Sequence, residues 1–290
     1  MKFPEFLGII IIGCFIAVEN FLVIMAAIRN KSLRENTHYN LVISLSVSDF
    51  VTGLSLILYG SFMTSPNDSD QTVIIIICNV YYCVGYAIYL TSLQQTFSIS
   101  LNRYLVITEN KLSQTLWNGN RKYLAFCVMV AISLIIFVPI FSNSEAGCNF
   151  QDMISTNNTP PTILFVLGSI QTMFILMTFV FYFLTLWNIF KMHHKTDTEV
   201  SAQTDESKER NVRKRKRMLN SMKVVSFILL ALLVSIIPAV VVSFKGLSSR
   251  TELLLLVLFS SSNSAINPII YCTNIKEVCN EVKIMFRINV

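Results

Sequence analysis

The sequence predicts an all-α membrane protein, a seven-transmembrane helix bundle followed by a short C-terminal amphipathic helix. Of its 290 residues, 53% are hydrophobic and only 14% are charged, which is too apolar for an ordinary soluble domain. Seven apolar runs are each long enough to cross the hydrocarbon core of a bilayer. Lysine and arginine gather in alternate connections between these runs, as expected of a multi-pass membrane protein.

The predicted spans follow one another at about residues 6–28, 39–63, 73–107, 123–141, 163–190, 224–244 and 253–275. The first run exceeds the apolar region of a usual signal peptide and no small-residue cleavage site follows it, which favours a span over a cleaved signal. Residues 191–223 carry acidic residues and then a dense basic run, and we interpret them as a solvated loop. Residues 274–286 alternate apolar and charged side chains at helical spacing, which predicts a short helix on the membrane surface.

The charge distribution also predicts the orientation. Twenty of the 23 lysines and arginines fall on the side of the C-terminus, so we expect a plasma-membrane protein with its N-terminus outside and its C-terminus in the cytoplasm. Two N-glycosylation sequons, beginning at Asn67 and Asn157, then both lie outside. Because the basic residues are explained by topology, nucleic-acid binding is excluded.

Two motifs lie on the third and seventh predicted helices. The residues concerned are Asn102, Arg103 and Tyr104 at the end of the third helix, and Asn267, Pro268 and Tyr271 on the seventh. Over about residues 6–286 the chain resembles the rhodopsin-like (class A) G-protein-coupled receptors, in which an acidic residue, Arg and Tyr close the third helix and Asn-Pro-x-x-Tyr marks the seventh. The resemblance implies a seven-transmembrane receptor domain over residues 6–275. It also implies an activation switch in which Tyr271 and Tyr182 meet Arg103.

A polar core is predicted around Asp49, near the middle of the second span, where an ionised carboxylate is costly unless it is paired or solvated. The positions that match the family's polar core and sodium site are Asn20, Asp49, Ser92, Asn263 and Asn267. The resemblance implies that Asp49 and neighbouring oxygen atoms hold a structural sodium ion in the resting state. A water-filled core without specific sodium binding is the alternative, and no other cofactor is expected.

The positions of the cysteines suggest a disulfide but do not fix which cysteines form it. Cys78 and Cys148 both lie on the predicted outer side, where oxidation is permitted, and the resemblance implies a disulfide between them. Cys83 is the rival partner, because sequence alone does not fix the pairing.

The ligand is not identified by the sequence. Amine receptors carry an aspartate eighteen residues before the arginine, where this chain has Gly85, and the seventh span lacks the lysine that opsins need. Both classes are therefore disfavoured. The candidate ligand contacts are Tyr82, Gly85, Tyr86, Tyr89 and Ile236. Core packing explains the tyrosine stripe about as well as a ligand pocket does.

The chain departs from the family pattern at several positions. Asn102 replaces the acid that would pair with Arg103, and no acid stands opposite it on the sixth helix. We therefore expect a weakly restrained Arg103 and high basal signalling that responds little to Asn102→Ala. Ile236 replaces the usual tryptophan of the sixth helix, and Phe174 the usual proline of the fifth.

These features together predict a receptor, not an enzyme, that transduces an extracellular or lipid-dissolved signal to a heterotrimeric G protein. Membrane lipid is an expected partner and arrestin a further candidate. Two alternatives stand beside this reading. A signalling-silent receptor-like protein would explain the missing switch residues, and a membrane transporter would explain the buried polar groups, although no paired repeat is present.

Overall fold

A computed structural model describes residues 3–35, 37–64, 71–110, 112, 121–142, 161–199 and 250–287, together with scattered positions between 226 and 241. Regular structure in these residues is entirely helical. The helices are α1 (Phe3–Arg29), α2 (Lys31–Glu35), α3 (Thr37–Thr64), α4 (Gln71–Ile107), α6 (Arg121–Ser142), α8 (Pro161–Glu199), α10 (Arg250–Asn274) and α11 (Lys276–Met285).

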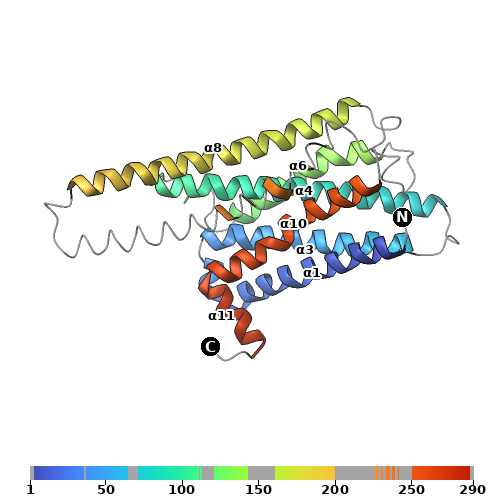
Figure 1. The fold of residues 1–290 in the computed structure, drawn as a ribbon, viewed down its shortest axis with the longest axis horizontal. Coiled ribbons are helices and arrows are strands. Elements are labelled where there is room, and N and C mark those ends of the chain that lie inside the picture. The colour runs from blue at the N-terminus through green and yellow to red at the C-terminus, as the bar shows by residue number, and fades with distance from the viewer. Residues whose placement is uncertain are drawn as a thin grey trace.

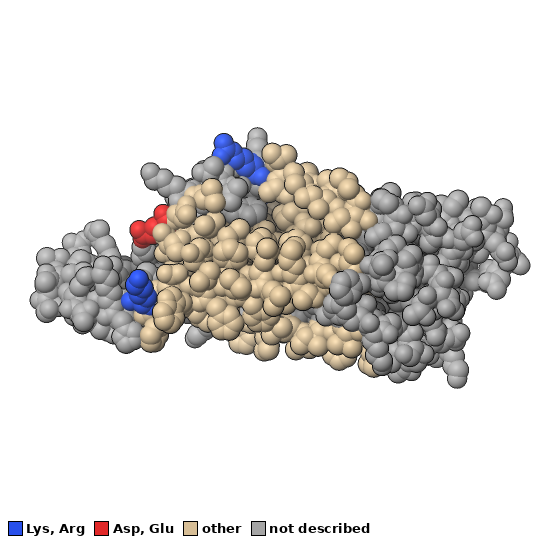
Figure 2. All heavy atoms as spheres, turned by 90° about the horizontal axis from the view of Figure 1, so that it is seen from above, with Lys and Arg blue, Asp and Glu red and all other residues tan. Residues whose placement is uncertain are grey.

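The long helices run side by side as a bundle, with the N-terminus at one end and the C-terminus at the other (Figure 1). Three of the described helices contain segments long and apolar enough to cross a membrane, namely Leu7–Arg29, Tyr39–Ser61 and Gly168–Lys191. Figure 2 shows that Lys, Arg, Asp and Glu are absent from most of the described surface on the face seen from above. Large apolar side chains such as Ile135 and Trp187 are exposed on the surface of the bundle, as expected where lipid is the solvent.

α4 is more polar than the lipid-facing helices because protein surrounds it. It packs against α3, α6 and α8. Its buried polar side chains are Thr91, Ser92, Gln94, Gln95, Thr96, Ser98, Ser100 and Asn102. Several of these residues hydrogen-bond to backbone carbonyls or to neighbouring helices, so the central helix supplies the polar interior of the bundle.

α1 and α3 approach closely at two glycines. A Cβ atom added to Gly53 would lie 2.6 Å from the Ala17 nitrogen and 2.8 Å from the Gly13 oxygen. Small residues at such a crossing let the backbones touch, which is how membrane helices gain packing energy without a hydrophobic driving force between them.

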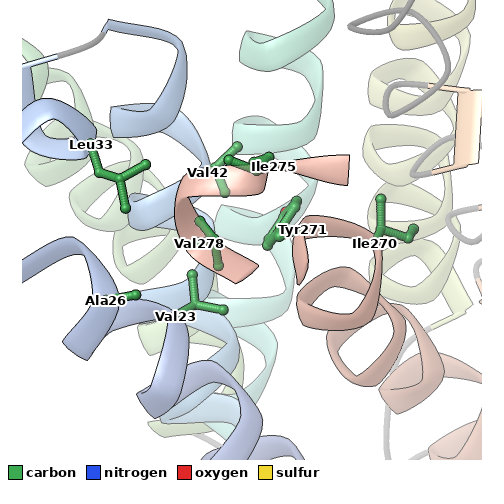
Figure 3. Packing of buried hydrophobic residues seen from close by; sticks show 8 residues of the cluster. All are labelled: Val23, Ala26, Leu33, Val42, Ile270, Tyr271, Ile275 and Val278. Atoms are coloured by element: carbon green, nitrogen blue, oxygen red, sulfur yellow. The ribbon is translucent and has the colours of Figure 1, made fainter. Parts of the chain in front are cut away.

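α11 turns away from the end of α10 and packs against α1 (Figure 1). Figure 3 shows the apolar cluster that holds this end of the bundle together. Its buried members are Val23, Ala26, Leu33, Val42, Ile270, Tyr271, Ile275 and Val278. α11 thus docks its apolar face on the bundle through Val278, whose side chain is only 3% exposed.

One boundary differs from the sequence prediction. The loop predicted at residues 191–223 begins as helix in the structure, because α8 continues to Glu199. No proline or glycine interrupts this segment, so nothing local ends the helix where the apolar run ends. The sixth predicted span, residues 224–244, lies mostly outside the described residues.

Candidate functional site

The Asp49 carboxylate is fully buried and is held by α10. The Ser264 hydroxyl donates to Oδ1 of Asp49 at 2.7 Å, and the Asn267 amide nitrogen donates to Oδ2 at 2.9 Å. Ser264 and Asn267 are three residues apart and therefore share one face of α10. Each carboxylate oxygen thus receives one hydrogen bond from the seventh span.

Asn20 adds the first helix to this arrangement. Its amide nitrogen donates to the backbone oxygens of Ile16 and Ser264, both at 3.0 Å. Because Ser264 in turn donates to Asp49, one chain of hydrogen bonds joins α1, α10 and α3. We call Asn20, Asp49, Ser264 and Asn267 the Asp49 network.

Several buried oxygen atoms around this network have no hydrogen-bond partner in the described part of the chain. They are Asn20 Oδ1, Ser92 Oγ, Asn263 Oδ1 and Asn267 Oδ1. Hard oxygen ligands beside one carboxylate fit a small cation such as sodium, and they also fit water.

Ser264 was missed by the sequence prediction, which chose Asn263. Asn263 is buried, yet its side-chain oxygen is unpartnered, whereas the smaller Ser264 contacts Asp49 directly. The signal was present in the sequence, since positions three apart, such as 264 and 267, face the same way on a helix.

Arg103 lies half-buried at the α11 end of α4, next to the buried Asn102. Tyr39 lies in the first turn of α3, at the same end of the bundle. The Tyr39 hydroxyl in turn lies 3.5 Å from Oε2 of Glu277 on α11. α3 and α11 therefore meet at this end of the bundle.

The two predicted switch tyrosines, Tyr182 and Tyr271, are not hydrogen-bonded to one another. The Tyr182 hydroxyl is hydrogen-bonded to the Ser226 hydroxyl at 2.5 Å. Tyr271 is completely buried in the cluster of Figure 3, and its hydroxyl has no hydrogen-bond partner among the described residues. The activation switch implied for these tyrosines stays a prediction.

Aromatic side chains join α4 to α8 next to this site. The ring centroids of Tyr104 and Phe181 are 5.5 Å apart, and Phe97 packs edge-on against both Phe181 and Phe174, at 5.7 Å and 6.1 Å. Phe174 therefore contributes packing at the position where the sequence lacks the proline usual in the family, and α8 runs through it without a break.

The outer half of α4 carries the candidate ligand contacts. Tyr89 presents a buried hydroxyl without a hydrogen-bond partner in the described residues, as does Gln171 of α8 with its side-chain oxygen. Gln171 is only 4% exposed. A Cβ atom added to Gly85 would meet no atom of the described residues within 4 Å. Tyr86 is half-buried in the same region.

Residues 19–271, most of the chain, match the family described as "7 transmembrane receptor (rhodopsin family)". The chain belongs to this family. The seven-transmembrane fold class is thereby confirmed, and the chain is a multi-pass membrane protein of the receptor class, not an enzyme.

Individual relatives of this rhodopsin-family receptor are distant. Melanopsin-B of Xenopus laevis is 34% identical over 42% of this chain, and 5-hydroxytryptamine receptor 2C of Mus musculus is 28% identical over 62%. Cannabinoid receptor 1 of Xenopus laevis is 22% identical over 96%. The matched regions cover 22%, 40% and 62% of these relatives, so the chain spans less than two thirds of their length.

Some residues predicted for this receptor cannot be placed. Asn67, Cys148, Asn157 and Ile236 lie outside the described residues, and so do the side chains of Cys78 and Tyr82, although both positions belong to α4. The disulfide and both glycosylation sites therefore stay predictions. Cys83, the rival disulfide partner, carries a free thiol.

Proposed function

We propose that the chain is a signalling receptor in which a ligand event at the outer end of the bundle frees Arg103 to engage a heterotrimeric G protein. The observation that carries this proposal is the separation of the switch residues. Tyr182 is bonded to Ser226, and the Tyr271 hydroxyl is buried without a partner. A buried polar group without a hydrogen bond costs free energy, so a second conformation that satisfies Tyr271 is energetically accessible.

In this proposal the α11 end of the bundle faces the cytoplasm, and the N-terminus lies outside. Arg103, Tyr104 and the end of α8 then lie at the surface that meets the G protein, with arrestin as a further candidate partner there. The basic residues that gather on this side support the orientation, because positively charged connections stay in the cytoplasm.

We propose that the ligand is a neutral molecule with an apolar body and one or two hydrogen-bonding groups. Gly85 supplies no charge, and the unpartnered oxygens of Tyr89 and Gln171 supply polar contacts. The relatives include a 5-hydroxytryptamine receptor and a melanopsin, yet this chain lacks an acidic residue at Gly85 and a lysine in residues 253–275. Its own residues therefore favour another ligand class.

We further propose that the Asp49 network binds sodium in the resting state. The four buried, unpartnered oxygens of Asn20, Ser92, Asn263 and Asn267 support this proposal, since they belong to residues of the polar core around a carboxylate that retains acceptor capacity. The ion would add positive charge beside Asp49 and hold α3, α4 and α10 in the resting arrangement.

The proposal is tested by ligand screening in cells that express chimeric G proteins, followed by nucleotide exchange on purified G proteins. Arg103→Ala should abolish exchange at equal surface expression. Arg29→Ala is the matched control, because it removes an exposed arginine from the same end of the bundle. A receptor that drives no exchange with any G protein class, with or without ligand, would instead be signalling-silent.

Uptake or current in reconstituted vesicles separates the receptor from the transporter alternative. We expect neither, because the described helices around Asp49 are continuous, whereas carriers bind their substrate at interrupted helices.

A further inference from the structure

Glu19 is an acidic residue in the middle of α1 that takes no part in the Asp49 network. It lies ten residues before Arg29, the last residue of the apolar segment Leu7–Arg29, so about 15 Å of helix separate it from that end of the segment. The hydrocarbon core of a bilayer is about 30 Å thick, which places Glu19 near its centre. An ionisable side chain at this depth is costly unless a partner neutralises it.

The rest of the chain offers this carboxyl group no cation at its own depth. The Oε2 atom of Glu19 is buried and has no hydrogen-bond partner among the described residues. The neighbouring Asn20 directs its amide nitrogen to the backbone oxygens of Ile16 and Ser264 instead. Across the seven predicted spans the sequence contains a single lysine, arginine or histidine, which is Arg103 near the end of the third span. A cation that pairs with Glu19 in mid-membrane must therefore come from another molecule.

Glu19 borders the exposed apolar face of α1. Phe15, one turn before it, is 50% exposed, Val18 is 58% exposed, and Glu19 itself is only half-buried. Gly8 precedes Glu19 by eleven residues, about three turns, and therefore lies on the same face of the helix. A Cβ atom added to Gly8 would meet no atom of the described residues within 4 Å, so the described bundle does not pack against this glycine. Small residues of this kind let a second membrane helix approach closely.

We propose that the face of α1 from Gly8 to Glu19 docks a transmembrane helix of another protein, one that carries a lysine or arginine at mid-depth. Charge complementarity selects this partner, because a cation and a carboxylate that are each costly in hydrocarbon neutralise one another when they pair. Depth selects a helix over a small amine. A free amine keeps its charge at the headgroups, whereas a spanning helix carries its side chain to the middle of the bilayer.

The docking is tested by fluorescence energy transfer between the labelled full chain and synthetic helices in lipid vesicles. The probes are a leucine-rich transmembrane helix with one central lysine and the same helix with a central leucine. Wild type should bind the lysine helix about threefold to twentyfold more tightly, the range that polar contacts between membrane helices produce. Glu19→Gln should bind both helices alike. Equal binding of both helices by wild type, or a lysine preference that survives Glu19→Gln, would overturn the proposal.

A third probe, with a central glutamate, separates a cationic partner from one that carries a carboxyl group. Two carboxyl groups can pair by sharing a proton, so a glutamate helix that binds wild type as tightly as the lysine helix would show that the partner need not be cationic, and the proposal would be wrong. We expect the glutamate helix to bind no better than the leucine helix.

The role of Gly8 is tested with the lysine helix. Gly8→Leu should weaken its binding, because the new side chain occupies the approach of the partner. Cys14→Leu is the matched control, since Cys14 is exposed on α1 but lies about a third of a turn away from the face of Gly8. If the lysine helix binds Gly8→Leu as tightly as it binds Cys14→Leu, this face of α1 is not the docking surface.

A melting measurement without any added helix shows whether the bundle itself stabilises the carboxyl group of Glu19. Glu19→Gln keeps the shape of the side chain and removes an uncompensated acid from the hydrocarbon core, so it should melt no lower than wild type. A lower melting temperature would mean that other residues of the chain hold Glu19, and it would overturn the proposal. Neither binding nor melting involves nucleotide exchange, so these results stand whether or not the proposed function does.

Discussion

Asn30 and Glu281 join two parts of the chain that lie 251 residues apart, through a hydrogen bond of 3.1 Å from the Asn30 amide nitrogen to Oε1 of Glu281. The oxygen of the same Asn30 side chain makes hydrogen bonds to the residues that follow it in the chain. Asn30 Oδ1 accepts from the backbone nitrogens of Ser32 at 3.0 Å and Leu33 at 3.4 Å, which is the geometry of a cap at the start of α2. One side chain therefore both begins α2 and anchors α11.

These two roles of Asn30 can be separated by substitution. Asn30→Asp keeps an oxygen for the cap of α2 but removes the donor and places a second carboxylate against Glu281. We expect faster hydrogen exchange of the α11 backbone amides, while exchange in α2 stays close to wild type. Asn30→Ala should accelerate exchange in both helices, because it removes the cap as well. Equal protection of α11 in Asn30→Asp and wild type would contradict the anchor.

The crossing of α1 and α3 predicts a steric effect at Gly53. Gly53→Ala places a methyl group 2.6 Å from the Ala17 backbone, so the two helices must separate. We expect a loss of about 2 kcal/mol of stability, measured as a lower melting temperature of the purified receptor. Gly8→Ala is the matched control on α1, since a Cβ atom there meets nothing within 4 Å. A Gly53→Ala receptor as stable as Gly8→Ala would show that the helices are not in contact.

Ser133 joins α6 to α4 at a position with no side-chain exposure. Its hydroxyl lies 3.1 Å from that of Thr91 and accepts from the Gln94 amide at 3.3 Å. Ser133→Ala leaves the buried Gln94 amide without this partner and should cost about 1–2 kcal/mol of stability in thermal unfolding. Ser98→Ala, at the same interface, removes only a 3.8 Å contact to the Met129 sulfur and should change stability much less.

The fold class could be predicted from the sequence because lipid imposes strong constraints on composition. Long apolar runs and alternating basic connections are readable one segment at a time, and the family match confirms the conclusion drawn from them. Asp49 could also be singled out, since a carboxylate in an apolar run is costly unless it is paired or solvated, and Asn267 could be singled out by the motif that it shares with the family.

Contacts between distant segments could not be predicted in the same way. Nothing in the residues around Tyr39 or Asn30 indicates a carboxylate more than two hundred positions away, because that contact depends on how α11 turns beneath the bundle. Ser133 is similar. The sequence shows only a serine within an apolar run, and the relative rotation of α4 and α6 decides which small polar residue takes part in the interface.

Ser264 allows a direct test of the contact with Asp49, because the structure rather than the sequence places it there. Ser264→Ala removes the donor to Oδ1 and should lower the stability of the receptor by about 1–2 kcal/mol. Ser262→Ala is the control two residues away. It removes only a hydroxyl that donates to the backbone oxygen of Phe259 in its own helix and should be close to neutral.

The same residues allow a test of sodium at equal ionic strength. Wild type should melt at a higher temperature and signal less without ligand in sodium chloride than in N-methylglucamine chloride, because an ion that binds only the resting state stabilises that state. At ten times its dissociation constant the gain is about 1.4 kcal/mol. Asp49→Asn should abolish the difference, since the amide carries no charge to hold the cation, whereas Ser262→Ala should retain it in full. Identical melting and signalling of wild type in the two salts would mean that water, rather than sodium, occupies the oxygens around Asp49.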